Sequence, residues 1–175
     1  IEKAGEVIPK CVGVVPEKQP AGGQVFQIPM VCPACGEPAV REETADIKCV
    51  NLNCPAQLER LICHFVGRGA MDIKGFGVVY VHDLIAEGYL KDVADIFTLS
   101  QYQEELIQKG IVGKVKNTDK LLAAIEKAKQ NPPDRLLTGL GISNVGKSAA
   151  QALMNHFGTM DALAQATEEE MMDID

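Results

Sequence analysis

Residues 70–85, AMDIKGFGVVYVHDLI, decide the fold of this chain. Their apolar residues and glycines follow the pattern h-x-x-h-x-G-h-G-x-x-x-h-x-x-h-h, where h is an apolar residue. Gly75 and Gly77 permit a tight turn, and the apolar spacing that follows predicts a helix. Backbone amides at the start of that helix have no acceptor within the helix, and the helix dipole favours an anion there. The stretch therefore predicts a helical hairpin that can bind a phosphate without net positive charge.

A second copy of the pattern lies at residues 142–154, ISNVGKSAAQALM. Asn144 stands where the first glycine stood, and asparagine tolerates the left-handed conformation better than most residues. The amides of Gly146 and Lys147 would then meet the anion. Any one such turn could be an ordinary connection between helices. Because the pattern is repeated, we favour two phosphate-binding hairpins.

Two further stretches match the pattern only in part. Around residues 110–114 the glycine spacing is wrong, so we assign no phosphate contacts to this degraded hairpin. Residues 171–175, MMDID, stop just where G-h-G would follow. We therefore expect the chain to be an excised piece of a longer protein.

Four cysteines form a pattern with the spacing of a metal site, C-x2-C-x13-C-x4-C: Cys32, Cys35, Cys49 and Cys54. A two-residue gap lets a turn point both sulfurs at one centre, and two pairs complete the tetrahedral thiolate shell of structural zinc. A pair of disulfides and an iron site are the alternatives. Cys11 and Cys63 lack partners at this spacing and are expected to be small buried residues. We expect His64 to be a helix-surface or core residue and not a ligand.

The remaining sequence predicts a mainly α chain with a short β segment first. Residues 1–15 are rich in β-branched residues, and residues 16–30 are rich in proline and glycine, as in a linker. From Pro55 onward the apolar spacing is helical, in segments too short to be stable alone. The expected helices cover residues 57–65, 78–86, 93–97, 119–129, 134–140, 147–157 and 160–166. We expect three parts, at residues 1–28, 29–66 and 67–175.

The net charge of −7 weakens a nucleic-acid hypothesis, because phosphate binding relies on lysine and arginine. The charge is unevenly distributed, however. Residues 151–175 hold six acids and no base, whereas residues 101–150 hold eight bases against five acids. No apolar run is long enough to span a membrane, and no secretory signal is present, so we expect a cytoplasmic protein.

Residues 141–148, GISNVGKS, also match the phosphate-loop pattern G-x-x-x-x-G-K-[ST] of nucleotide hydrolases. Such a loop must follow a buried parallel strand, yet residues 132–140, PPDRLLTGL, predict a short helix. Too few residues follow Ser148 for the remaining strands. The hydrolase remains a weak alternative.

In their order along the chain, these motifs closely resemble bacterial NAD-dependent DNA ligases. The resemblance runs from the end of the oligonucleotide-binding (OB) barrel through the zinc finger into the helix-hairpin-helix domain. It therefore implies a tandem helix-hairpin-helix domain preceded by a small four-cysteine zinc finger and a short β segment. The residues that carry it are KAGEVIP at 3–9, CPACG at 32–36, Cys49, CPAQ at 54–57, HFVGRGAMDIKGFG at 64–77 and LLTGLGI at 136–142.

The resemblance implies a parent enzyme that seals nicks in duplex DNA during replication and repair. In that family a lysine is adenylated from NAD, AMP passes to the 5′ phosphate, and the 3′ hydroxyl displaces it. No K-x-D-G motif occurs here, so this chain should lack catalytic residues and activity of its own. NAD and magnesium would bind outside it, and zinc would be its one cofactor.

The implied partners are nicked double-stranded DNA and the adenylation, OB and BRCT domains of the same polypeptide, near the bacterial nucleoid. The chain would hold the DNA backbone without reading sequence. The alternative is an interdomain scaffold with no DNA affinity of its own. The candidate DNA-binding residues are Arg68, Lys74, Gly75, Gly77, Asn144, Gly146 and Lys147.

Overall fold

The computed structural model describes residues 2–4, 8–18, 22, 26–41, 46–51, 54–172 and 174. The chain divides into two units, Ile1–Met30 and Val31–Asp175. Within the described ranges, no helix is both long and apolar enough to span a lipid bilayer.

The first unit contains a small β-hairpin. Strands β1 (Glu2–Ala4) and β2 (Ile8–Lys10) pair antiparallel, with Lys3 opposite Pro9. A 3-10 turn, η1 (Pro16–Lys18), follows. This hairpin confirms the predicted β segment, although residues 1 and 5–7 of that segment lie outside the described residues. The expectation that Cys11 is buried is wrong, because two three-residue strands provide no second layer against which it could pack.

The second unit begins with a short antiparallel ribbon and continues as helices. Strand β3 (Ala39–Arg41) pairs with β4 (Ile47–Cys49), and Ala39 lies opposite Cys49. Five residues after Cys49, Cys54 caps the first helix, α1 (Pro55–Val66). The proline at the first helical position suits a site where no amide donor is needed.

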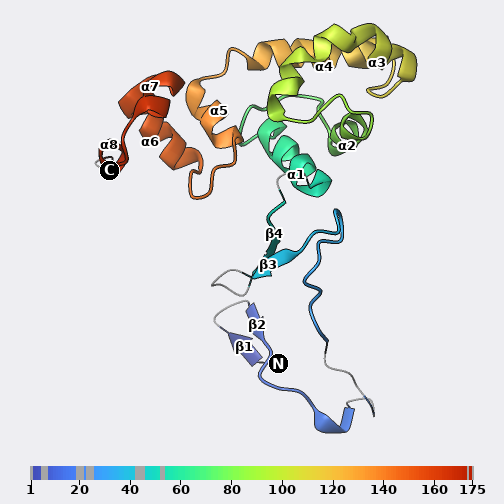
Figure 1. The fold of residues 1–175 in the computed structure, drawn as a ribbon, viewed down its shortest axis with the longest axis vertical. Coiled ribbons are helices and arrows are strands. Elements are labelled where there is room, and N and C mark those ends of the chain that lie inside the picture. Colours follow the sequence, from blue (N-terminus) through green and yellow to red (C-terminus); the bar gives the residue numbers. More distant parts are fainter. Residues whose placement is uncertain are drawn as a thin grey trace. The chain divides into compact units, whose positions relative to one another are not determined.

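Helices of the second unit are joined in hairpins, which Figure 1 shows along the chain. The first hairpin consists of α1, residues 67–77 and α2 (Val78–Ala86). The second consists of α3 (Gln103–Lys109), residues 110–114 and α4 (Val115–Ala128). The third consists of α5 (Pro133–Gly139), residues 140–146 and α6 (Lys147–Phe157). The remaining helical segments are η2 (Val93–Tyr102), α7 (Met160–Gln165) and α8 (Glu168–Met172).

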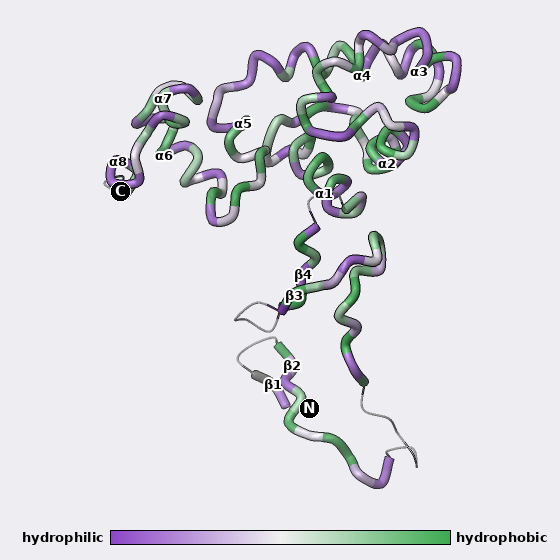
Figure 2. The backbone as a smooth tube through the Cα atoms, viewed as in Figure 1, coloured by the Kyte–Doolittle hydropathy of each residue, from purple (hydrophilic) through white to green (hydrophobic). Residues whose placement is uncertain are grey.

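One main core holds the first two hairpins together. Ile62 and Phe65 of α1, Leu84 of α2 and Leu106 of α3 are at most 1% exposed. Each such side chain stabilises the fold by about 1.5–3 kcal/mol on burial. Apolar segments alternate with polar ones along these helices (Figure 2), as expected for helices with one buried face. The third hairpin adds a smaller cluster of Leu137, Ala150 and Met154.

The mainly α prediction is confirmed, and the bounds of α2 and α6 agree with the predicted ranges. Four elements differ from the expectation, and one of them is α4, which begins at Val115, four residues before its predicted start. Residues 93–97 begin a 3-10 helix that runs to Tyr102, and the sequence patterns had missed both α3 and α8. The end of the fourth pattern cannot be compared, because Asp173 and Asp175 lie outside the described residues.

Candidate nucleic-acid interface and metal centre

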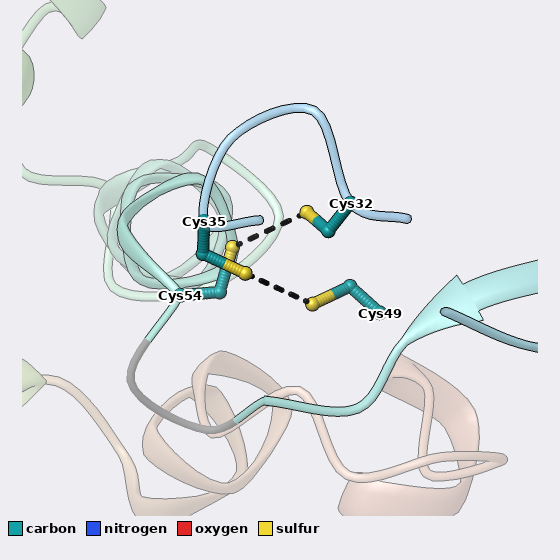
Figure 3. A group of neighbouring side chains, drawn as sticks. All are labelled: Cys32, Cys35, Cys49 and Cys54. Atoms are coloured by element: carbon teal, nitrogen blue, oxygen red, sulfur yellow. Dashed lines mark hydrogen bonds between the residues drawn. The ribbon is translucent and has the colours of Figure 1, made fainter. Parts of the chain in front are cut away.

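The four predicted ligand cysteines meet at one point. Their sulfurs all lie within 4.8 Å of one another, and Figure 3 shows the side chains converging. Sγ of Cys32 lies 3.9 Å from that of Cys54, and Sγ of Cys35 lies 3.6 Å from that of Cys49. A tetrahedral zinc site with Zn–S bonds of about 2.3 Å requires sulfurs about 3.8 Å apart. The two Sγ–Sγ distances match this spacing, so the cluster has the size of a zinc site.

Local backbone geometry places each sulfur. Gly36 adopts a φ of 77°, which closes the turn after Cys35, and its amide donates to the carbonyl of Cys32 over 2.9 Å. Cys49 ends β4, and its carbonyl accepts a 3.0 Å hydrogen bond from Nε2 of Gln57. Cys54 is the N-cap of α1 and is 1% exposed. The cysteine cluster therefore connects the β3–β4 ribbon to the N-terminus of α1.

Backbone amides, burial and the neighbouring sulfurs together shift the pKa values of two of the thiols. Backbone amides of Cys35 and Ala34 lower the pKa of Cys32 to about 7. At Cys49 the amide of Asn51 lowers the pKa, but desolvation and the neighbouring sulfurs outweigh it and raise the pKa to about 12. Four thiolates this close repel one another, so a bound cation is needed for all to ionise together.

The hairpin turns share one unusual backbone feature: two left-handed residues three positions apart. These are Asp72 and Gly75 in the first hairpin, with φ of 49° and 81°, and Gly141 and Asn144 in the third, with 66° and 66°. Asn144 thus adopts the conformation for which the sequence pattern requires glycine. The N-caps that follow, Gly77 and Gly146, have extended backbones.

The hydrogen bonds of the two turns also correspond. In the first, the amide of Phe76 donates to Ile73, and in the third, the amide of Val145 donates to Ile142, over 3.3 and 3.0 Å. The described residues supply no acceptor for the amides of Gly75, Gly77 and Val78, nor for those of Asn144, Gly146 and Lys147. Both turns therefore present unpaired donors at the positive end of a helix dipole.

The second hairpin has the same left-handed pair, Gly110 and Gly113, but a different helix start. Lys114 is the N-cap of α4, so one residue fewer separates the turn from the helix than in the other two hairpins. The amide of Asn117 already donates to Lys114 over 2.8 Å, and its side chain fills the space beside Gly113. This hairpin therefore has a different arrangement of donors at its turn.

Distant residues brace the first hairpin. Arg135 donates from Nε to the carbonyl of Ala70 over 2.6 Å and from Nη2 to that of Arg68 over 2.9 Å. Asn131 donates to the carbonyl of Met71 over 2.7 Å. Sequence reasoning missed Arg135 and Asn131, because they follow α4 and no local motif marks them.

The predicted basic residues differ in their surroundings. Lys74 is exposed and pairs with Asp72 over 2.8 Å, whereas the exposed side chain of Arg68 makes no ion pair with any described acid. Lys147 is exposed in the first turn of α6. His64 lies on α1 and donates from Nε2 to the carbonyl of Thr138 over 2.8 Å, away from the cysteine cluster. It fits the helix-surface role predicted for it.

Residues 141–148, the match to a phosphate loop, connect α5 to α6. A phosphate loop requires a buried parallel strand before it, and here that position is occupied by a helix. The structure contradicts the nucleotide-hydrolase alternative.

Comparison with known proteins gives two domain matches. Residues 31–56 match the NAD-dependent DNA ligase C4 zinc finger domain, and residues 135–175 match the helix-hairpin-helix motif. The first range contains the cysteine cluster, and the second covers the third hairpin from Arg135 onward. Both matches agree with the geometry described above, and the first names zinc as the metal of such domains.

Curated relatives match almost the whole chain. It is 45% identical over 176 residues to a DNA ligase of Clostridium kluyveri, covering 100% of this chain and 26% of the relative. DNA ligases of Symbiobacterium thermophilum and Acidobacterium capsulatum are 45% and 46% identical, over 98% of this chain and 25% of each relative. The chain thus spans about a quarter of the length of these relatives. The resemblance to a segment of NAD-dependent DNA ligases is confirmed.

Proposed function

From this resemblance, we propose that the chain is the DNA-gripping part of an NAD-dependent DNA ligase. The first and third hairpins would each hold a phosphate of a nicked duplex through the amides around Gly75, Gly77, Asn144, Gly146 and Lys147. Arg68 and Lys74 would add charge beside the first hairpin. Because phosphates carry no base identity, this grip would not depend on sequence.

One observation carries the proposal: two turns 69 residues apart repeat the same backbone and leave equivalent amides unpaired. A turn that only joined helices would not need to preserve this arrangement. Amide donors at a helix start bind an anion without a lysine or arginine. This explains how a chain with a net charge of −7 could bind DNA.

The parent enzyme would seal nicks by the ligase reaction, with NAD as the source of AMP and magnesium as the second cofactor. This chain has no K-x-D-G motif, so the adenylated lysine and both cofactor sites would lie in other domains of the polypeptide. The adenylation, OB and BRCT domains would be its intramolecular partners. Acting on chromosomal DNA, the protein would work in the cytoplasm at the nucleoid.

Zinc would be held by Cys32, Cys35, Cys49 and Cys54. Four thiolates leave no open coordination position, so the metal would supply structural stability only. Because Cys54 is also the N-cap of α1, the metal would anchor the first helix of the first hairpin.

Aspartate at the two N-caps tests the proposal. Gly77→Asp and Gly146→Asp have open space for the side chain, and aspartate is a good N-cap, so the helices should keep or gain stability. The new carboxylate would nevertheless repel a phosphate at the same amides. Gly13→Asp changes the charge equally in open space outside the hairpins and is the control.

The measurement is fluorescence anisotropy of a labelled nicked duplex at low and moderate salt, with intact duplex of another sequence as competitor. We expect binding that weakens as salt rises, ignores sequence and falls about tenfold in each hairpin variant but not in the control. Equal affinity of all four proteins would contradict the phosphate role of the turns.

An interdomain scaffold is the second candidate function. The net charge of −7 and the altered second hairpin favour it. It predicts that a folded, zinc-loaded chain shows no binding to the duplex even at low salt.

A further inference from the structure

A small cavity lies between the turn of the first hairpin and the end of α4. It has a volume of about 130 Å³. Its charged and polar lining residues come from three segments distant in sequence: Asp72 and Lys74, Lys127, and Asn131 with Arg135. None of these positions belongs to the amide donors assigned to the hairpins.

Positive charge dominates the cavity. Three cationic side chains line it against one carboxylate, that of Asp72. A hydrogen bond from Lys74 lowers the pKa of this carboxyl, and the charges of Arg135 and Arg68 lower it further. The Lys74–Asp72 pair is open to solvent, with the side chain of Lys74 70% and that of Asp72 33% exposed, and is hence weak, so Lys74 can exchange it for another anion.

Lys127 brings to the cavity a charge without a partner. It pairs with none of the acids that the structure describes, whereas Lys129, two residues on, pairs with Glu126 over 2.6 Å. Lys116 and Lys120 share the exposed face of α4 with Lys127, at i, i+4 and i+11. This row of lysines leads along α4 towards the cavity.

Two donors in the cavity wall are already fixed in place. Arg135 is held by its bonds to the carbonyls of Ala70 and Arg68, which leave its Nη1 group unused by described residues. Asn131 is held by the carbonyl of Met71. Fixed donors bind an anion at a smaller entropic cost than mobile ones.

We propose that this cavity is a second phosphate-binding site, in which Lys127, Lys74 and Arg135 hold one phosphate group. The identification of that group as a DNA backbone phosphate rests on the proposed function. The site would extend the grip from the hairpin turns onto the basic face of α4. A free phosphate has the same chemistry, and the experiment separates the two sources.

Lys127→Met removes the unpaired charge, and Lys129→Met removes an equal charge at the C-cap of α4, outside the cavity. Thermal unfolding checks that both variants fold as the wild type does. With the duplex anisotropy assay, we expect Lys127→Met to weaken binding about three- to tenfold and to lower the slope of log affinity against log salt by about one. Lys129→Met should change neither.

If wild type binds DNA and the two variants behave alike, the backbone-phosphate site is overturned while the proposed function stands. If wild type does not bind DNA, the proposed function fails. Titration with inorganic phosphate then shows whether the cavity binds phosphate. NMR signals of the Asn131 side-chain amide and of Arg135 Nε–H should then shift in wild type and not in Lys127→Met. The absence of such shifts would overturn the site itself.

Discussion

The first and third hairpins have the same turn but different support. Both contain a pair of left-handed residues, and in both the equivalent amides find no acceptor in the described part of the chain. In the first, Ile73 and Phe76 are 4% and 6% exposed. At the corresponding positions of the third, Ile142 is 50% exposed and Val145 is half-buried.

This difference shows that the conformation of a turn and the support of that turn have separate causes. The turn itself follows from residues that tolerate positive φ, which both hairpins have. The turn of the first hairpin lies in the main core, and Asn131 and, from α5, Arg135 donate to its carbonyls, whereas Ile142 and Val145 in the turn of the third lie outside that core. We therefore expect the two turns to bind alike when formed, but the first to open far less often.

Removal of the metal should have the largest effect and should act on the cysteine-bearing segment and on the start of the first hairpin, not on the third hairpin. Structural zinc contributes on the order of 10 kcal/mol or more to folding in small zinc fingers. Since Cys54 caps α1, chelation should abolish protection of residues 31–41 and 46–51 and of the first turn of α1 from hydrogen exchange. Protection in α6 should not change. Cys49→Ser should reproduce the effect and Cys63→Ser should not; an α1 that stays protected without metal would contradict this coupling.

Truncation of the matched isoleucines should give the next largest difference. Ile73→Ala removes a buried side chain and should lower the free energy of unfolding by about 2–5 kcal/mol. Ile142→Ala removes a half-exposed one and should cost less than about 1 kcal/mol. Urea denaturation of both variants measures the two values. Equal losses would show that burial does not distinguish the hairpins.

Loss of the two hydrogen bonds from Arg135 to the carbonyls of Ala70 and Arg68 should have a smaller effect. Arg135→Met leaves the carbonyls of Ala70 and Arg68 without their donor and should destabilise the protein by about 2–3 kcal/mol. Hydrogen exchange should rise in residues 67–77 more than in residues 140–146. Arg60→Met, which removes an exposed arginine without a described ion pair, serves as control. If Arg60→Met destabilises the protein as much as Arg135→Met does, the hydrogen bonds of Arg135 do not stabilise the first hairpin.

The smallest effect should be a pH dependence of the first hairpin. Nδ1 of His82 on α2 lies 3.0 Å from a carboxylate oxygen of Glu59 on α1, and this contact raises the pKa of His82. The stabilisation should be complete below the ordinary histidine pKa of about 6.5. It should disappear as pH rises through the raised pKa of the folded state.

Chemical denaturation midpoints from pH 5 to 8 test this dependence. The difference between wild type and Glu59→Gln should be largest at the acidic end. A constant difference across the range would exclude a role for the His82 charge.

Several features of this protein could be predicted from sequence because they depend on neighbours a few residues apart. The spacing of the four cysteines predicted a cluster that the structure forms. The glycine pattern predicted the ends of α2 and α6. Both the turn before each helix and the spacing of its apolar residues depend only on residues a few positions apart. Helix α3 was missed, since its only apolar residues, Leu106 and Ile107, are adjacent and show no helical spacing.

Tertiary structure alone decided what supports each turn. Arg135 meets Ala70 across 65 residues, and Lys127, Lys74 and Arg135 share one cavity only after the helices have packed. No sequence pattern marks such contacts, because they depend on how buried faces combine and not on local backbone preference. Sequence determined the conformation of the turns and the metal cluster, and packing determined which turn is buried and held by distant residues.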